Sequence, residues 1–202
     1  MTHLFSVCTP YNVPSKTHYS LELIVKNKLP NFAYQLQLAG PDVEETIQGK
    51  DKIRQFLNAA YGGTGPNGEQ GFNVYEGIVF ENLPKLNRTP LMSAEELEDY
   101  TVEFARHGLH GPLNWYRCRE LNFADELSLT TTTLNLPVLF FQPMHDVAIV
   151  PKSSIGMERN VPNMTRVQLD AGHWALTQRS KEINTKLQEW FREVVWGGRS
   201  SL

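Results

Sequence analysis

Three short apolar segments, far apart in the chain, constrain the fold more than any other feature. They are residues 3–8 (HLFSVC), 136–141 (LPVLFF) and 165–169 (TRVQL). Apolar runs of this length are typical of strands that are buried on both faces of a sheet. We therefore predict three buried strands.

The segments that follow the second and third strands indicate how the sheet is built. Residues 151–159 (PKSSIGMER) can form a helix, and a strand–helix–strand unit makes its two strands parallel. Residues 180–195 carry apolar side chains at helical spacing, with charged side chains opposite. We expect this amphipathic helix to pack on the sheet through Ile183, Leu187, Trp190, Phe191 and Val194.

Residues 15–133 have a different character, because helical segments there are interrupted by Pro and Gly. We predict a large, mostly helical cap inserted between the first and second strands. Residues 1–14 and 134–202 then form a partial core of about three parallel strands, so that the fold class is α/β.

One helix of the predicted cap has clear signals at both ends. Ser93 and Glu96 have the spacing of a capping box, and Gly108 marks the end of the helix. The spacing between them predicts that the inward side chains are Leu97, Tyr100 and Phe104.

Composition excludes several classes of partner. The chain has 202 residues, 20% of them charged, and a net charge of -3, so nothing favours binding to a nucleic acid backbone. No apolar run approaches the roughly 18 residues that span a bilayer, and we expect no membrane partner. The chain has only two cysteines, too few for the disulfide framework of a secreted protein, and this number favours a location in the cytoplasm. The final SSL only weakly resembles a peroxisomal signal.

Two side chains follow predicted strands at positions suited to catalysis. Asp146 comes after the second strand, and His173 follows the third in the string DAGHW. If these strands are adjacent and parallel, both residues emerge at one edge of the sheet and can meet. An Asp bonded to one imidazole nitrogen leaves the other nitrogen to act as a base. His145 is a competitor by adjacency, but we expect it to point away from the direction of Asp146, and no second acidic or nucleophilic motif accompanies it.

Two tyrosines of the cap are a second candidate group. Tyr34 lies in FAYQL and Tyr116 in GPLNWYR, and two phenols can hold one oxygen and give it a proton. Aromatic residues of helical caps more often pack as core, and this alternative stays open on spacing alone. The remaining histidines, His3, His18, His107 and His110, show no spacing of a metal site, and we expect neither metal nor cofactor.

A nucleophile is missing from the printed sequence. Neither G-x-S-x-G nor G-x-D-x-G occurs, and no H-G-x-P turn supplies an oxyanion hole. Cys8 reads as a small buried hydrophobic residue at the end of the first strand, and Cys118 lies in a helix of the cap. Neither is a good substitute.

Several strings, in their order along the chain, resemble the soluble epoxide hydrolases of the α/β-hydrolase fold. They are NFAYQLQLAGPDVE, HGLHGPLNWYR, MHDVAIVP and DAGHW, with the final amphipathic helix. The resemblance covers the C-terminal portion of that family, from the sixth strand through the cap to the last helix.

The resemblance implies a role for each candidate residue. Tyr34 and Tyr116 would hold and activate the oxygen of a small apolar epoxide, Asp146 would orient the histidine, and His173 would activate water. In the family, an Asp nucleophile opens the epoxide to an alkyl-enzyme ester, and water then releases a vicinal diol. The alternatives are a haloalkane dehalogenase or an esterase of the same fold, or a non-catalytic remnant that binds a ligand.

The segment that holds the nucleophile in the family has no counterpart in these 202 residues. We therefore expect the chain to be part of a longer enzyme and to be inactive alone. We also expect the first strand to present an unpaired apolar edge that promotes association.

Overall fold

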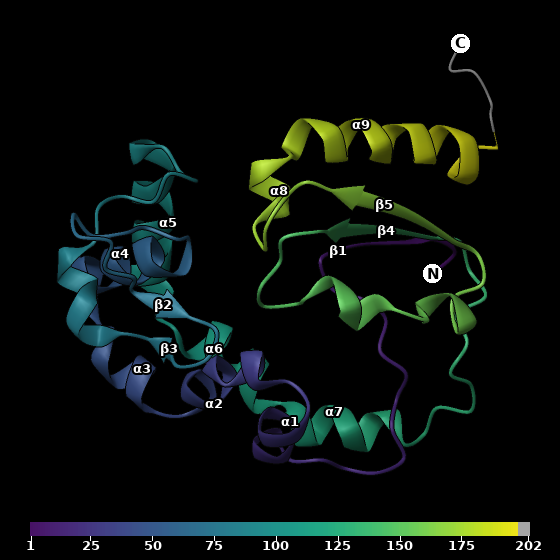
Figure 1. Ribbon diagram of the computed structural model, residues 1–202, viewed down its shortest axis with the longest axis horizontal. Coiled ribbons are helices and arrows are strands. Elements are labelled where there is room, and N and C mark those ends of the chain that lie inside the picture. Colours follow the sequence, from purple (N-terminus) through teal and green to yellow (C-terminus); the bar gives the residue numbers. More distant parts are fainter. Residues whose placement is uncertain (198–202) are drawn as a thin grey trace. The chain divides into compact units, whose positions relative to one another are not determined.

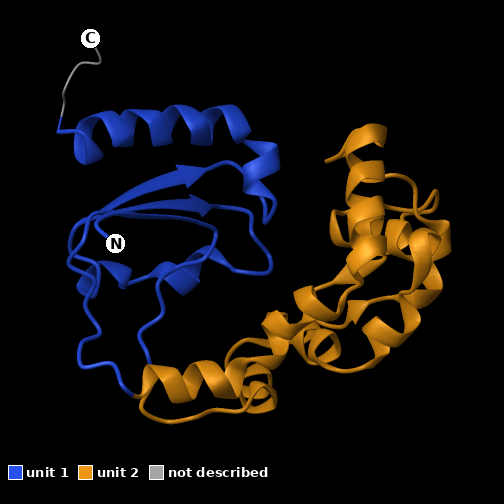
Figure 2. Cartoon of the chain, turned by 180° about the vertical axis from the view of Figure 1, so that it is seen from behind, with its two compact units in different colours: residues 1–14, 128–202 blue, residues 15–127 orange. Residues whose placement is uncertain are grey.

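The computed structural model describes residues 1–197, which divide into two compact units. The first unit combines residues 1–14 with the chain from residue 128 onward, and the second comprises residues 15–127 (Figure 2). The first unit contains the predicted strands, and the second contains most of the helices.

A parallel three-stranded sheet forms the centre of the first unit (Figure 1). Its strands are β1 (Leu4–Val7), β4 (Val138–Pro143) and β5 (Met164–Leu169), in the order β1-β4-β5. All six residues of β4 are buried, because this strand lies between the other two. The prediction of three parallel strands, in a partial α/β fold, is confirmed.

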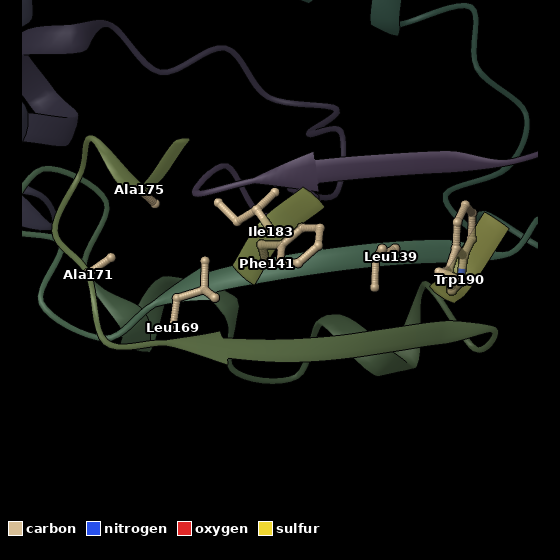
Figure 3. Close-up of a cluster of buried hydrophobic side chains, with 7 residues drawn as sticks. All are labelled: Leu139, Phe141, Leu169, Ala171, Ala175, Ile183 and Trp190. Carbon is tan, nitrogen blue, oxygen red and sulfur yellow. The ribbon is translucent and has the colours of Figure 1, made fainter. Parts of the chain in front are cut away.

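Alternate side chains of β4 pack on opposite faces of the sheet, as strand geometry requires. On one face Leu139 and Phe141 join a cluster that Ile183 and Trp190 of α9 (Ser180–Trp190) complete, as Figure 3 shows. The short helix α8 (Ala175–Gln178) adds Ala175 to this cluster. Each large side chain buried in this way stabilises the fold by about 1.5–3 kcal/mol.

The opposite face of the sheet is covered by two short 3₁₀ helices, η3 (Pro151–Ser154) and η4 (Met157–Arg159) (Figure 1). The prediction of one helix over residues 151–159 is therefore wrong in detail. The break falls at Gly156, whose φ of 81° is left-handed, and an α-helix cannot continue through such a residue.

The last helix of the sequence changes its winding near its end. After Trp190 the chain continues as a π-helical turn, η5 (Phe191–Val195). A π turn carries an extra residue, which rotates the apolar face by about one position. Val194, expected to face the sheet, is consequently 37% exposed, and Val195 packs against the cluster instead.

The second unit consists mostly of helices, together with a short antiparallel pair of strands. Its elements are α1 (Leu21–Asn27), η1 (Pro30–Phe32), α2 (Tyr34–Ala39), α3 (Asp42–Thr46), α4 (Gly49–Ala60), β2 (Phe72–Asn73), β3 (Gly77–Ile78), η2 (Phe80–Lys85), α5 (Ala94–His107), α6 (His110–Arg117) and α7 (Arg119–Glu126).

The capping box predicted for α5 is confirmed, with reciprocal hydrogen bonds between Ser93 and Glu96. Leu97 is buried as expected, but Tyr100 is 44% exposed, so its inward placement is wrong. The buried residue at this level is Thr101, whose hydroxyl donates to the Leu97 carbonyl within the helix. A small residue whose hydroxyl group is hydrogen-bonded within its own helix can occupy a position in the core.

Within residues 1–197, none of the helices combines the length with the hydrophobicity that crossing a bilayer requires. The C-terminal SSL, which weakly resembles a peroxisomal signal, lies outside the described residues.

Candidate active site

Asp146 lies three residues beyond the end of β4 and is almost entirely buried, with 2% of its surface exposed. Its Oδ1 accepts hydrogen bonds from the backbone N–H groups of Ala148 and Ile149, both at 2.8 Å. An Asp that bonds its own backbone two and three residues later closes a local turn. This turn fixes the direction of the second carboxylate oxygen.

His173 lies four residues beyond the end of β5, with its Nδ1 2.9 Å from Oδ2 of Asp146. The two residues meet because β4 and β5 are adjacent and parallel, with Pro143 opposite Leu169 at their ends. The carboxylate can accept a hydrogen bond from the Nδ1–H group, which leaves Nε2 as the basic nitrogen. Since 38% of the imidazole side chain is exposed, a water molecule can reach it.

Backbone hydrogen bonds join the two loops that carry this pair. The Met144 N–H donates to the Leu169 carbonyl at 2.9 Å, and the His145 N–H donates to the Ala171 carbonyl at 3.0 Å. The Gly172 N–H donates to the side-chain oxygen of Gln178, at 2.7 Å. The ladder of β4 and β5 therefore extends into the loops and holds the Asp–His pair in register.

His145 has an acidic partner, Asp170, which the sequence analysis did not predict. Its Nε2 is 2.9 Å from Oδ1 of Asp170, and Arg179 contacts the other oxygen at 2.8 Å. These bonds, first from His145 and then from Arg179, lower the pKa of the Asp170 carboxyl. Both His145 and Asp170 are exposed, so the cluster forms a surface ion pair and not a buried catalytic pair.

Cys8 directly follows β1 at the same edge of the sheet and contacts the loop that carries His173. Its N–H donates to the Phe141 carbonyl, and its thiol donates to the His173 carbonyl with a 3.2 Å separation. Cys8 is half-buried and has a left-handed φ of 66°, which is rare outside Gly. Burial, and secondarily the charge of Asp146, raise the pKa of the thiol to about 11. A thiol that stays protonated at neutral pH is a poor nucleophile.

The second unit brings Tyr34 and Tyr116 together. Tyr34 begins α2 and Tyr116 lies near the end of α6, and their ring centroids are 6.2 Å apart in an edge-to-face arrangement. Tyr34 is 9% exposed, and its ring also packs against Phe72. Burial, followed by the neighbouring phenol of Tyr34, raises the pKa of Tyr116 to about 12. The Tyr116 phenol is thus protonated at neutral pH and able to donate a hydrogen bond.

Arg117 fixes the relative position of the helices that carry these tyrosines. Its guanidinium donates to the carbonyls of Ala39 and Gly40, at the end of α2, with distances of 3.1 and 3.2 Å. The same group forms an ion pair with Glu44 of α3 at 2.8 Å, and His110 of α6 contacts the other Glu44 oxygen at 2.9 Å. These contacts join α6, which carries Tyr116, to α3 and to the end of α2, which begins with Tyr34.

Cys8 and Arg117 were not singled out by the sequence as parts of these groups. The sequence does contain a signal for Cys8, since a residue that follows the first of three parallel strands emerges at the same edge as Asp146. For Arg117, the sequence offers only its position next to Tyr116. Helical spacing does not predict that the guanidinium binds the carbonyl groups at the end of α2.

No family model matches the chain, but several known proteins do. An epoxide hydrolase of Neurospora crassa is 34% identical to it over 202 residues, which cover 95% of this chain and 59% of that protein. The bifunctional epoxide hydrolase 2 of Mus musculus is 28% identical over 193 residues, or 94% of this chain and 34% of that protein.

A solved structure shows the same arrangement of elements. The potato (Solanum tuberosum) epoxide hydrolase I matches with a TM-score of 0.71 and 19% identity, over 95% of this chain and 62% of that one. The chain thus spans less than two thirds of the length of each of these relatives.

Proposed function

This chain is a homologue of the epoxide hydrolases along nearly its whole length, and on that premise we propose that it carries the water-activating and epoxide-holding residues of such an enzyme. The observation that carries the proposal is the coexistence of two pairs: Asp146 with His173, and Tyr34 with Tyr116. The substrate would be a small apolar epoxide. The chain contains no G-x-D-x-G elbow, so the nucleophile would come from residues beyond these 202.

The first proposed step opens the epoxide ring. A carboxylate attacks one ring carbon, the bond from that carbon to the ring oxygen breaks, and the oxygen takes a proton from a phenol of Tyr34 or Tyr116. Two donors that converge on one oxygen stabilise the negative charge that develops on it. The Tyr116 phenol, whose pKa burial raises to about 12, remains protonated for this task at neutral pH.

The second proposed step releases the product. His173 takes a proton from water at Nε2, and the hydroxide attacks the carbonyl carbon of the ester. The bond from that carbon to the alkyl oxygen breaks, the alkyl oxygen takes the proton of the attacking hydroxide, and a diol leaves as the carboxylate is restored. The imidazolium then gives its proton to solvent, and the phenolate left by the first step takes one from solvent, so both groups return to their starting states. Asp146 would hold the imidazole with its proton on Nδ1 and stabilise the imidazolium that forms.

The tyrosine pair favours epoxides over the alternatives. A haloalkane dehalogenase must hold a leaving halide, which needs no proton, and an esterase needs an oxyanion hole for a tetrahedral intermediate. A non-catalytic remnant would need neither the orientation of His173 by a buried carboxylate nor the paired phenols. We also propose a reducing compartment such as the cytoplasm, in line with free thiols at Cys8 and Cys118.

A chimera tests the proposal. This chain would replace the matching segment of the Neurospora crassa epoxide hydrolase, and the product would be assayed with an epoxide, a haloalkane and an ester. We expect diol formation from the epoxide, with turnover lowered by Tyr34→Phe and further by adding Tyr116→Phe. Leu23→Ala, an exposed position of the same unit, is the matched control. Preferred turnover of the haloalkane or ester, or double-variant activity equal to that of the control, would refute the assignment.

A further inference from the structure

Cys8 adds a third potential metal ligand to the Asp146–His173 pair. One ligand atom from each of the three residues lies within 4.8 Å of the other two. The residues come from three different loops, which follow β1, β4 and β5 at the same edge of the sheet. The group therefore depends on the fold and not on a local sequence motif.

We propose that Cys8, Asp146 and His173 form a binding site for Zn²⁺ or another thiophilic divalent cation, with water as the fourth ligand. Zn²⁺ binds thiolate sulfur, imidazole nitrogen and carboxylate oxygen at about 2.0–2.3 Å, so the ligand atoms around one ion lie about 3–4 Å apart. The observed separations need only small movements to reach that geometry. Mg²⁺ and Ca²⁺ fit poorly, because they require six or more oxygen ligands.

Two of the three ligands are already held in place by other bonds. Oδ1 of Asp146 accepts from Ala148 and Ile149, which leaves Oδ2 as the coordinating atom. The backbone of Cys8 is tied to β4 through its hydrogen bond to Phe141. Ligands held by surrounding hydrogen bonds lose little freedom when a metal binds, and this favours affinity.

Metal binding would remove the proton of the Cys8 thiol and move the proton of the His173 imidazole from one nitrogen to the other. The Cys8 thiol would give up its proton to solvent and turn from the His173 carbonyl toward the cation. The imidazole would stay neutral but move its proton from Nδ1 to Nε2, with Nδ1 on the metal. One cation, one thiolate and one carboxylate then give a site of zero net charge, which suits a largely buried position.

The site would compete with water activation. With Nδ1 on the metal and a proton on Nε2, His173 has no nitrogen left to act as a base. This consequence rests on the proposed function, but the binding itself does not. His173 is the most exposed member of the group, with 38% of its side chain accessible, whereas the side chains of Cys8 and Asp146 are buried within it.

The test uses the 202-residue chain and zinc chloride. Zn²⁺ affinity would be measured by competition with a chromogenic chelator, and Co²⁺ would report a thiolate ligand through its sulfur-to-metal charge-transfer absorption. Cys118→Ser is the matched control for Cys8→Ser, since Cys118 is the second half-buried free cysteine and lies in the other unit. We expect one ion per chain, and affinity lowered on the order of tenfold or more by Cys8→Ser, with loss of the cobalt band.

Further measurements keep the proposal open to refutation. Zinc should raise the unfolding temperature of the unsubstituted chain and of Cys118→Ser, but not that of Cys8→Ser. If Cys8→Ser does not fold, His173→Gln replaces it, with the same loss of affinity expected. The absence of stoichiometric binding, or equal binding by Cys8→Ser and Cys118→Ser, would overturn the site. Because no epoxide is used, that result leaves the proposed function standing, and failure of the chimera leaves the zinc site standing.

Discussion

Replacing Asp146 by Asn or by Ala separates the two tasks of its carboxylate. Oδ1 closes a turn by accepting from Ala148 and Ile149, while Oδ2 faces Nδ1 of His173. Asn keeps an oxygen for the turn but presents an NH₂ group to the histidine. Ala removes both atoms. The two variants should therefore differ in stability and agree in their effect on catalysis.

The magnitudes follow from the hydrogen bonds that each variant loses. A hydrogen bond to a charged group contributes about 1.5–3 kcal/mol, and the two amides share one buried oxygen. We expect Asp146→Ala to lower the free energy of unfolding by about 3 kcal/mol. Neutral bonds contribute about 0.5–1.5 kcal/mol, so Asp146→Asn should lose only about 1 kcal/mol.

Urea unfolding and amide hydrogen exchange measure this difference on the 202-residue chain. The unfolding midpoint should fall clearly more for Ala than for Asn, and exchange at Ala148 and Ile149 should become faster in Ala alone. Equal midpoints for the two variants, with both amides still protected in Ala, would refute the claim that Oδ1 maintains the turn.

Catalysis in the chimera should be lost in both variants. The Asn NH₂ group donates to Nδ1 of His173, which forces the imidazole proton onto Nε2 and removes the base. An exchange of Asp for Asn beside a catalytic His costs on the order of 10⁴ in turnover. An Asn variant that is both stable and fully active would show that Asp146 does not orient His173.

Three further predictions concern other features. Tyr116 should titrate near pH 12, because burial raises its pKa in the folded chain. Its contribution to stability should therefore be complete below about pH 10 and be lost as the pH rises toward 12. Ultraviolet absorption of the phenolate measures the titration, and ionisation near pH 10 would contradict the prediction. The Cys8 thiol, with a pKa near 11, should react with iodoacetamide at pH 8 far more slowly in the folded chain than in urea, and equal rates would contradict its burial. In the part of the chain that the structure describes, β1 is an edge strand and carries the exposed side chain of Phe5. Light scattering should therefore detect self-association, which Phe5→Lys should reduce. A chain that stays monomeric at all concentrations would contradict this prediction.

The strands could be predicted because each buried strand corresponds to a short run of mostly apolar residues in the sequence. Residues 136–141 are apolar without alternation, which is what the central strand of a covered sheet requires, and β4 is indeed buried along its whole length. The encounter of Asp146 with His173 followed from the same inference, since adjacent parallel strands deliver both residues to one edge. The sheet order was thus enough to bring the candidate pair together.

Other features depend on interactions that no local pattern records. The π turn after Trp190 exchanges Val194 for Val195 on the sheet, and helical spacing alone assumes a constant 3.6 residues per turn. Thr101 takes a core position that the pattern assigned to Tyr100, because its hydroxyl is satisfied within the helix. The left-handed backbone of Cys8 is likewise a tertiary feature, imposed where β1 ends against β4.

Trapping of the alkyl-enzyme ester tests the central proposal most directly. In the chimera, His173→Gln should leave the ring-opening step intact and block ester hydrolysis, because the base that activates water is gone. Mass spectrometry after incubation with excess epoxide should then show a protein heavier by the mass of one epoxide, and the unsubstituted chimera should show little of this species. Diol formation by His173→Gln at an undiminished rate, with no adduct, would contradict the account.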